Sequence, residues 1–313
     1  MKKAILYYFT GTGNTGLCAN YIKKYLNELD IQTDSFEVDY KNTEAPNPND
    51  YDIIGIGYPI HAFNVPQVFN NFIKKLPKVE DKLLFFFKVS GEPFSFNNAS
   101  SYHIYRKLKK KGYKLINEKH FLMPYNIIFK YPDNLQKQMY LYLEPLAHAY
   151  AIQISKEEDH HIKYHLPSKI LSFLFRIEWV APKVNALFFH SKKKKCTMCM
   201  KCVNSCPTNS LYIKKGKIKT HTSCALCMRC SLNCPNNAIN MGILNLWVVN
   251  GGFHYKKLVE NKEIHGDHVT YNTRGYFRKF RKYFLKQNEM LREYNIDIPV
   301  NYKKEDLLEN MIK

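Results

Sequence analysis

Residues 3 to about 125 alternate short apolar runs with segments whose apolar residues recur at helical spacing. Strands are predicted by the runs AILYYF, IQTDSFEV, YDIIGIG and KLLFFFKVS, and a late strand around EKHFLMP completes five. Helices are predicted between them by TGLCANYIKKYLNEL, VPQVFNNFIKKL and SSYHIYRKLKKKGY. Near-continuous apolar strands that alternate with helices indicate an α/β fold, in which a parallel sheet is covered on both faces.

The middle of the chain is less regular. From Tyr131 to His165 the pattern is helical and polar, and it ends in KEEDHHIKYH. His161 and His165 are four residues apart, which on a helix would place two metal ligands on one face, but a solvated polar helix end is the stronger interpretation. Residues 167–190 are amphipathic and interrupted by Pro182. This favours a connector packed on the protein, with contact to a membrane surface as the weaker alternative.

Length and composition restrict the class of protein. The 313 residues are enough for about two domains, and a hydrophobic content of 45% is enough for a sizeable core. The chain has no apolar run of about 18 residues, and the start MKKAILYYFTGTG reaches glycines too early for a signal peptide. We therefore expect a cytoplasmic protein without a transmembrane segment.

The formal net charge of +20 raises the question of a nucleic-acid partner. Only 7 of the 47 basic residues are Arg, and Lys, Asn, Ile and Tyr are abundant, as in proteins encoded by AT-rich genomes. The basic stretch Val269–Asn288 has six Lys or Arg, no acid, and aromatic residues at Phe277, Phe280 and Phe284. A helix whose apolar face packs on the protein is preferred here to a nucleic-acid or membrane surface, and no nucleic-acid partner is expected.

Eight of the nine cysteines lie between Cys196 and Cys234. The segment KCTMCMKCVNSCPTNSLYI recurs as SCALCMRCSLNCPNNAIN, 28 residues later (from Cys196 to Cys224), and each copy reads C-x2-C-x2-C-x3-C-P. Without a secretion signal, this spacing indicates a metal site in a reducing compartment rather than disulfides. Paired zinc sites usually join two C-x2-C pairs through a longer loop, so three cysteines at successive x2 intervals suit an iron–sulfur cubane better.

Residues 192–242 resemble the bacterial two-cluster ferredoxins, and every expected cysteine is present. In such modules the proline-ended turn carries the fourth cysteine of each repeat to the other cluster. The resemblance implies a small α+β ferredoxin-like domain with two [4Fe-4S] clusters. The ligands of cluster one would be Cys196, Cys199, Cys202 and Cys234, and those of cluster two would be Cys224, Cys227, Cys230 and Cys206.

A glycine-rich loop, YFTGTGNTG, follows the first predicted strand. Gly11, Gly13 and Gly16 satisfy G-x-G-x-x-G, and Asp39 after the next strand could serve as the ribose-binding acid of a dinucleotide site. The loop also carries four polar side chains, and a terminal phosphate dianion profits from hydroxyl donors beside backbone N–H groups at a helix start. This chemistry favours the phosphate of flavin mononucleotide (FMN), bound by Thr10, Gly11, Thr12, Gly13, Asn14 and Thr15.

Two further loops agree with a flavin. Ligands of open parallel sheets lie beyond the carboxyl ends of the strands, and there the third and fourth predicted strands continue into YPIHAF and SGEPF. Aromatic side chains at Tyr58, Phe63 or Phe94 could stack on the isoalloxazine ring, although core packing explains each of them as well. The candidate contacts to the ring are Tyr58, Pro59, Ile60, His61, Phe63, Ser90, Gly91 and Glu92.

Together the three loops resemble those of flavodoxins, and the segment LYYFTGTGNTGLCA is similar to the phosphate-loop signature of that family over its full length. The resemblance implies a five-stranded, doubly wound parallel sheet of order 2-1-3-4-5. We divide the chain into a flavodoxin-like FMN domain (1–165), a connector (166–192), a ferredoxin domain (193–242) and a basic, partly helical extension (243–313).

A flavodoxin-like domain ahead of a two-cluster ferredoxin resembles the flavodoxin–ferredoxin fusion proteins of anaerobic bacteria. Each cubane passes one electron at a time, whereas a flavin can store two. The expected function is electron transfer between the clusters, FMN and an external redox partner, which would be an acidic ferredoxin, an acidic flavodoxin or an unidentified reductase. Two alternatives stay open: an oxidoreductase that reduces a small molecule with electrons from its own clusters, and a regulatory protein whose clusters sense oxygen.

Overall fold

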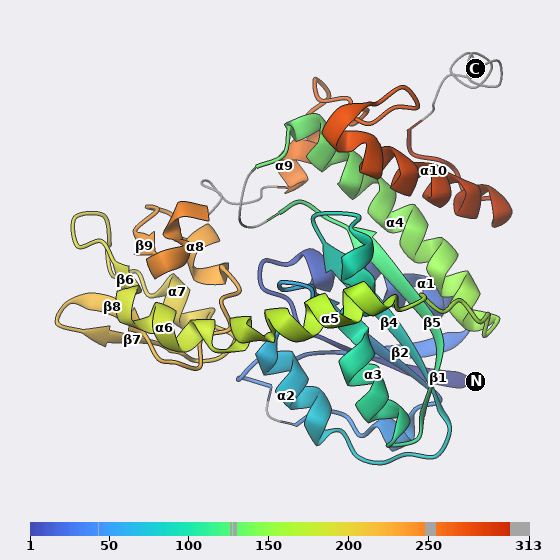
Figure 1. The fold of residues 1–313 in the computed structure, drawn as a ribbon, viewed down its shortest axis with the longest axis horizontal. Coiled ribbons are helices and arrows are strands. Elements are labelled where there is room, and N and C mark those ends of the chain that lie inside the picture. The colour runs from blue at the N-terminus through green and yellow to red at the C-terminus, as the bar shows by residue number, and fades with distance from the viewer. Residues whose placement is uncertain (43, 126, 128–129, 248–254, 301–313) are drawn as a thin grey trace.

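A computed structural model describes residues 1–313 except 43, 126, 128–129, 248–254 and 301–313 (Figure 1). Its centre is a parallel sheet of five strands in the order β2-β1-β3-β4-β5. The strands are β1 (Lys2–Tyr8), β2 (Ile31–Glu37), β3 (Ile53–Pro59), β4 (Lys82–Ser90) and β5 (Tyr113–Leu122). This order confirms the predicted flavodoxin-like fold. Because all five strands are parallel, the phosphate loop and the loops after β3 and β4 leave the same edge of the sheet.

Helices cover both faces of the sheet, as the near-continuous apolar strands require. Along β1, Ala4 and Leu6 point into one core, and Ile5 and Tyr7 into the other, because successive side chains of a strand alternate. The first core is closed by α1 (Asn14–Glu28) and α4 (Asp133–Ser155), and the second by α2 (Gln67–Lys75) and α3 (Tyr102–Lys109). Two short 3-10 helices, η1 (Pro48–Asp50) and η2 (Ser95–Ser101), lie in the connecting loops.

The C-terminal extension returns to the first domain. It contains α9 (Tyr255–Glu260), η5 (Gly275–Phe277) and α10 (Arg278–Glu293), and Figure 1 shows α10 lying beside α4. Phe280 and Phe284 are fully buried in the core that α1 and α4 close, which confirms the prediction of a helix with a packed apolar face. The hydroxyl of Tyr283 donates to the carbonyl oxygen of His120 at 3.0 Å, so α10 also covers part of the edge strand β5.

Two expectations for the middle of the chain are wrong. Helix α4 ends at Ser155, and most of its side chains are buried rather than solvated. Residues 161–165 are not helical, so His161 and His165 do not share a helix face. Instead, Nε2 of His161 lies 2.8 Å from a carboxylate oxygen of Asp159. The helical spacing of the two histidines therefore carries no metal site.

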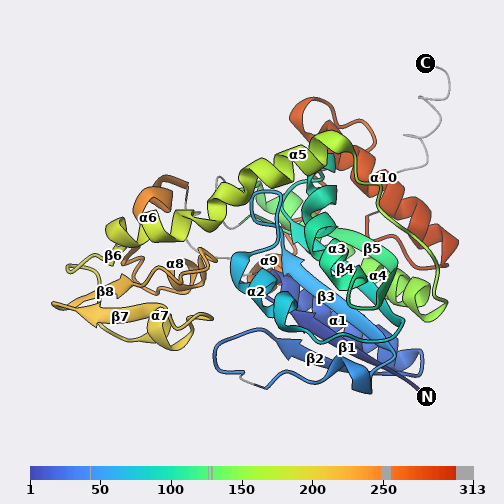
Figure 2. The same cartoon turned by 60° about the horizontal axis from the view of Figure 1, so that its bottom comes forward.

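The connector joins the two domains as α5 (Leu166–Leu174), η3 (Phe175–Trp179) and α6 (Ala181–Phe188) (Figure 2). The prediction that its apolar face packs on the protein is wrong, because the buried residues of α5 are Ser168 and Ser172 while its large apolar side chains are mostly exposed. None of the helices in the described part of the chain is long and apolar enough to span a membrane.

The cysteine module is small and has two short antiparallel ladders. One pairs β6 (His190–Ser191) with β9 (Ile239–Asn240), and the other pairs β7 (Leu211–Lys214) with β8 (Lys217–Thr220). Two single-turn helices, α7 (Lys201–Asn204) and α8 (Arg229–Leu232), each contain the third cysteine of a repeat, and η4 (Gly242–Trp247) ends the module. In Figure 1 the module lies beside the sheet and is reached along α5 and α6.

Candidate functional site

The phosphate loop joins the end of β1 to the start of α1. Gly13 caps the helix with a φ of 103°, a left-handed conformation that glycine adopts without a steric penalty, and its N–H donates to Oγ1 of Thr10 at 3.0 Å. The first turn of α1 contains no acid, so the positive end of the helix dipole is unopposed. Backbone N–H groups and a hydroxyl-rich loop at such an end suit a phosphate, and Thr10 to Thr15 would hold it.

Not every polar side chain of this loop points toward that phosphate. The amide of Asn14 donates to the carbonyl oxygen of Pro124 at 3.3 Å and accepts from the Tyr140 hydroxyl at 3.2 Å. Thr15 is almost fully buried. The side chain of Asn14 therefore ties the loop to α4 and to the end of β5, and the backbone N–H groups of the loop would supply most of the donors to a phosphate.

The end of β3 differs from the expectation at one residue. The Tyr58 side chain is fully buried, lies 3.2 Å from Oγ of Ser100 and packs with the helices of the second core, so it cannot stack on a flavin. Further along, His61 and Asn64 exchange backbone hydrogen bonds of 2.9 and 2.7 Å. They enclose Phe63, which has a φ of 63°. A left-handed Phe is rare outside strained or functional turns.

Phe63 points into a group of aromatic side chains at the sheet edge. Its ring lies 6.3 Å from Phe96 and 5.2 Å from Phe175, both edge-on. Pro59 ends β3, and the N–H of Ile60 donates to the carbonyl oxygen of Val89 at 2.8 Å, which joins this loop to the end of β4. The Phe63 ring is thus packed against two other aromatic rings, and its predicted contact with the flavin stays a prediction.

The loop after β4 is held by polar contacts. Oγ of Ser90 lies 2.7 Å from Nε2 of His120 and also accepts from the Asn97 amide at 3.2 Å. A Cβ atom on Gly91 would lie 2.5 Å from the ring of Tyr125, so only glycine allows this ring to pack on the backbone there. Tyr125 was not predicted as a site residue. Its ring stacks on that of Tyr131 at 5.4 Å.

Glu92, a predicted contact of the flavin ring, has a different role in the structure. Its carboxylate is buried and accepts hydrogen bonds from the Tyr276 hydroxyl and the Lys279 ammonium of the C-terminal extension. The Lys279 ammonium also lies 4.0 Å from the centre of the Phe94 ring. The side chains of Glu92 and Phe94 therefore anchor η5 and α10 above this loop, and the expectation that they face the flavin is corrected.

The eight predicted cluster cysteines fall into two groups. One cavity of the module is lined by Cys196, Cys199 and Cys202 of the first repeat together with Cys234 of the second. In the second group, burial raises the pKa of the Cys227 thiol, and the charges of Cys224 and Cys206 raise it further. Burial also raises the pKa of the Cys230 thiol, which the same two cysteines and Cys202 of the first group raise further. The fourth cysteine of each repeat therefore lies with the first three of the other, as the crossed arrangement requires.

The backbone around these cysteines has the same conformation in both repeats. Met198 and Met200 have left-handed φ values of 55° and 62°, and their counterparts Leu226 and Met228 have 50° and 61°. Such residues turn successive N–H groups inward, a geometry found around phosphates and iron–sulfur clusters. The repeats also share an N–H donated to the fourth sulfur, at 3.3 Å from Ser210 to Cys206 and 3.2 Å from Ala238 to Cys234.

This donor set fits a cubane. Among the described residues, no three Cys, His, Asp or Glu side chains come close enough together to hold one metal ion. A cubane does not require this, because each cysteine binds a different iron atom around the cavity. Burial raises the pKa of the Cys227 thiol to about 12, so a thiolate at this position needs a bound cation such as iron.

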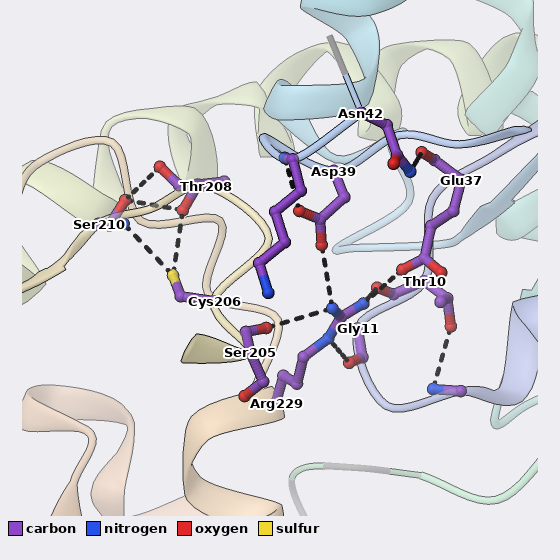
Figure 3. A network of polar contacts seen from close by, with 12 residues as sticks. Thr10, Gly11, Glu37, Asp39, Asn42, Ser205, Cys206, Thr208, Ser210 and Arg229 are labelled. Atoms are coloured by element: carbon purple, nitrogen blue, oxygen red, sulfur yellow. Dashed lines mark hydrogen bonds and ion pairs between the residues drawn. The ribbon is translucent and has the colours of Figure 1, made fainter. Parts of the chain in front are cut away.

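Arg229 of the second repeat binds the phosphate loop through hydrogen bonds (Figure 3). Its guanidinium donates to the carbonyl oxygens of Thr10 and Gly11 at 2.6 and 2.8 Å. It also forms ion pairs of 2.7 Å with Glu37 and 3.3 Å with Asp39 at the end of β2. A fifth bond, of 3.2 Å, goes to the carbonyl oxygen of Ser205, beside the fourth cysteine of the first repeat. Asp39 thus pairs with an arginine instead of a ribose.

Sequence reasoning missed Arg229, although the repeat carries a signal for it. The equivalent position of the first repeat is Lys201, which is exposed. A guanidinium can donate in several directions at once, whereas an ammonium is a point charge. The change from Lys to Arg between two otherwise similar repeats marks the copy that contacts the flavodoxin-like domain.

Two backbone contacts complete this interface. A Cβ atom on Gly11 would lie 2.5 Å from the carbonyl oxygen of Cys227, so the phosphate loop and the second repeat touch directly. The N–H of Tyr40 donates to the carbonyl oxygen of Pro207 at 3.0 Å. Cys227 and the residue before Pro207, Cys206, both belong to the second cysteine group. That group therefore lies nearer the phosphate loop than the first.

Comparisons with known proteins agree with the two halves of this site. Residues 5–124 match the family model described as a flavodoxin domain, and residues 192–212 match the model described as a 4Fe-4S binding domain. These matches support FMN and at least one 4Fe-4S cluster as cofactors. The search of curated proteins finds no match.

Several solved structures are similar to part of the chain. A flavodoxin of Streptococcus pneumoniae TIGR4 is 19% identical, with 38% of this chain and 85% of that chain covered and a TM-score of 0.33. Flavodoxin 1 of Bacillus cereus is 14% identical, with 50% and 95% covered and a TM-score of 0.34. The flavodoxin of Megasphaera elsdenii is 22% identical, with 37% and 84% covered and a TM-score of 0.31.

The two family matches lie on the two parts of the chain that the geometry separates: the five-stranded sheet with its phosphate loop, and the module with its paired cysteine groups. The chain therefore carries a flavodoxin domain followed by a 4Fe-4S ferredoxin-type domain, which supports a flavodoxin–ferredoxin fusion.

Proposed function

We propose that this electron-transfer flavoprotein holds two [4Fe-4S] clusters and one FMN, and that its second cysteine group stands between the first group and the flavin. The contact of Gly11 with the carbonyl oxygen of Cys227 is the observation that carries this proposal. It joins the phosphate loop to a predicted ligand of cluster two by van der Waals contact. When bound, the clusters would supply one-electron carriers and FMN would supply two-electron storage.

The chain's own residues would keep the distance between the second cluster and the flavin short and would exclude water from the clusters. Arg229 has a side chain that is only 14% exposed, and it fixes the second repeat on the flavodoxin-like domain through two bonds to the phosphate loop and two ion pairs at the end of β2. Apolar side chains such as Met228, Ile239 and Met241 are buried around the cysteines and exclude water from them. The first cysteine group includes the exposed Cys199, so it would be the side that an external redox partner approaches.

A reductive titration tests the cofactor set. The anaerobically purified protein should consume about four electrons per chain, one for each of two clusters and two for FMN. Iron, sulfide and acid-released flavin would be measured on the same sample. FAD in place of FMN, zinc in place of iron, or an uptake of only about three electrons would each contradict the proposed set.

A second candidate function, reduction of a small organic molecule, is favoured by one cavity. A space of about 930 Å³ lies between α2, the connector and the second repeat, and its walls include His61, Lys75, Trp179 and Cys224. This volume is in the range of small-molecule sites. Burial lowers the pKa of His61 to about 4, so its imidazole would be neutral at pH 7 and would donate a single ring N–H.

Filling this cavity separates the two candidates. Asn71 is exposed on α2, lines the space and is itself no predicted cofactor contact, so Asn71→Trp would occupy part of the space without replacing a predicted cofactor residue. A reductase should lose turnover with an organic acceptor in this variant, while exchange with a protein carrier is unchanged. Equal turnover of variant and wild type with every acceptor tested would remove the reductase candidate.

A further inference from the structure

The connector presents its apolar side to solvent and its polar side to the protein. The residues of α5 that are buried are Ser168 and Ser172, and those of α6 are Pro182 and Asn185. Six of its large apolar side chains are 53–75% exposed. We call these six the apolar ridge: Leu166, Phe173, Leu174, Ile177, Leu187 and Phe188. This arrangement is the reverse of an ordinary surface helix, whose apolar stripe faces the core.

Buried hydrogen bonds fix this orientation. Oγ of Ser172 donates to the Asn64 side chain at 2.9 Å, and the Asn64 amide donates to the carbonyl oxygen of Ser172 at 2.8 Å. At the other end, the side-chain oxygen of Asn185 accepts from the N–H of Ile243 at 3.0 Å. Rotating the helices to bury the ridge would break these bonds inside the protein, where an unpaired polar group is costly. The ridge is therefore built to face outward.

The ridge extends over both domains. Its first half lies on α5 beside the flavodoxin domain and its second half on α6 beside the cysteine module, along one edge of the molecule in Figure 2. From η4, Ile243 and Leu246 add two more apolar side chains that are 48% and 87% exposed. Residues 166–188 span about 34 Å if they are continuously helical. An apolar edge of this length is long for a surface that only water touches.

The connector and the residues that follow it carry an excess of positive charge. Residues 166–195 contain seven Lys or Arg and a single acid, Glu178. The guanidinium of Arg176 lies 5.3 Å from the centre of the Phe173 ring, and Lys183 and the run Lys192–Lys195 are exposed. Long basic side chains can keep their charges at the level of lipid headgroups while neighbouring apolar side chains enter the acyl region. The connector segment therefore combines exposed apolar side chains with an excess of basic residues, the two features of an interfacial helix.

We propose that the apolar ridge lies in the interfacial layer of an anionic lipid membrane and holds both domains of the protein against it. A second copy of the chain would cover the ridge less well, because two chains of net charge +20 repel each other. Anionic headgroups instead complement the charge, and the acyl region covers the apolar side chains. Such binding is peripheral, and it does not depend on which cofactors the site holds.

Vesicle sedimentation of the anaerobic holoprotein tests this proposal. The protein should bind vesicles of phosphatidylcholine with 30% phosphatidylglycerol at least about tenfold more tightly than vesicles of phosphatidylcholine alone. The variant Ile177→Glu/Leu187→Glu should lose roughly tenfold or more in binding to the anionic vesicles. The control is Ile213→Glu, because Ile213 is 51% exposed on β7, outside the ridge, and its variant should bind like wild type.

Two readouts keep the proposal falsifiable. The visible spectrum of the clusters checks that each variant is folded, and the comparison of anionic with neutral vesicles needs no variant at all. Equal binding of wild type to both vesicle types, or equal binding of the ridge variant and wild type, would overturn the proposal. So would a stable dimer in sedimentation velocity that Ile177→Glu abolishes, because a second copy would then cover the ridge.

Discussion

At position 11 a single methyl group would lie 2.5 Å from the carbonyl oxygen of Cys227, closer than atoms can approach. Gly11→Ala should therefore force the second repeat away from the phosphate loop at a cost of about 1–3 kcal/mol. Amide hydrogen exchange around Arg229 should become faster by roughly 5- to 150-fold. Gly16→Ala is the matched control, because a methyl group there meets only ordinary contacts of 3.4 and 3.5 Å. Equal exchange in both variants would contradict the close contact.

A second residue-scale prediction concerns Lys119, which is buried and donates to Oε1 of Gln287 at 2.7 Å. Burial, and then the charge of Lys286, lowers the pKa of Lys119 to about 7. Between about pH 7 and its unfolded pKa of about 10.4, the unfolded chain binds a proton that the folded chain does not. The free energy of unfolding should therefore fall as the pH falls through this window, by up to about 1.4 kcal/mol per unit.

Replacing the ammonium removes this dependence. Lys119→Met should be more stable than wild type near pH 7, and the difference should shrink toward pH 9.5. Thermal midpoints measured anaerobically over this range check the prediction. Lys114 is exposed on the same strand, so the thermal midpoint of Lys114→Met should change with pH in the same way as that of wild type. A constant difference between Lys119→Met and wild type would mean that Lys119 stays charged in the fold.

At the scale of elements, the single-turn helix α8 positions the interface through Arg229. Its ion pairs with Glu37 and Asp39 are largely shielded from water, with side-chain exposures of 30% and 12% for the two acids. In a double-mutant cycle, Arg229→Ala and Asp39→Asn should show a coupling of about 0.5–2 kcal/mol in the opening of this interface. Lys201→Ala, at the equivalent position of the first repeat, should leave the opening unchanged. If the effects of Arg229→Ala and Asp39→Asn were additive, the ion pair between these two residues would not stabilise the interface.

The crossed cysteine groups give a second prediction at this scale. Cys206→Ala should damage the same cluster as Cys224→Ala, because Cys206 lies with the cysteines of the second repeat. Paramagnetic resonance spectra of the reduced variants should therefore lose the same signal, while Cys234→Ala should lose the other one. If Cys206→Ala and Cys234→Ala exchanged these outcomes, each repeat would close its own site.

At the scale of the whole molecule, charge governs encounter with a partner. The run Lys192–Lys195 is exposed beside the first cysteine group, which suits an acidic redox carrier. Exchange of electrons with such a carrier should slow steeply with added salt, because steering raises association rates by roughly 10- to 1000-fold only while charges are unscreened. Neutralising these four lysines should flatten the salt dependence measured by stopped flow.

The control for steering lies at the other end of the sheet. Lys78, Lys109, Lys110 and Lys114 are equally exposed but surround the amino ends of β4 and β5. Neutralising these four changes the net charge by the same amount and should leave the salt dependence close to that of wild type. If both quadruple variants behave alike, net charge rather than local placement sets the rate.

The sequence by itself determined the features that depend on local spacing and periodicity. A parallel sheet covered on both faces follows from apolar strands alternating with amphipathic helices, and the observed strand order β2-β1-β3-β4-β5 is the one that the resemblance to flavodoxins implied. The paired cysteine groups follow from the 28-residue repeat, since short loops force neighbouring cysteines to converge. The phosphate loop follows from glycines and hydroxyl groups directly after a strand.

Only the tertiary structure decided which surfaces meet. Arg229 and Gly11 are 218 residues apart, and Glu92 and Lys279 are 187 apart, so no local pattern pairs them. Tyr58 could serve a flavin or the core, and its burial among packed helices decided for the core. The connector shows most clearly what a sequence pattern alone cannot decide. Periodicity identifies its apolar face, but whether that face meets protein or solvent depends on the hydrogen bonds that Asn64 and Ile243 donate to it from elsewhere in the fold.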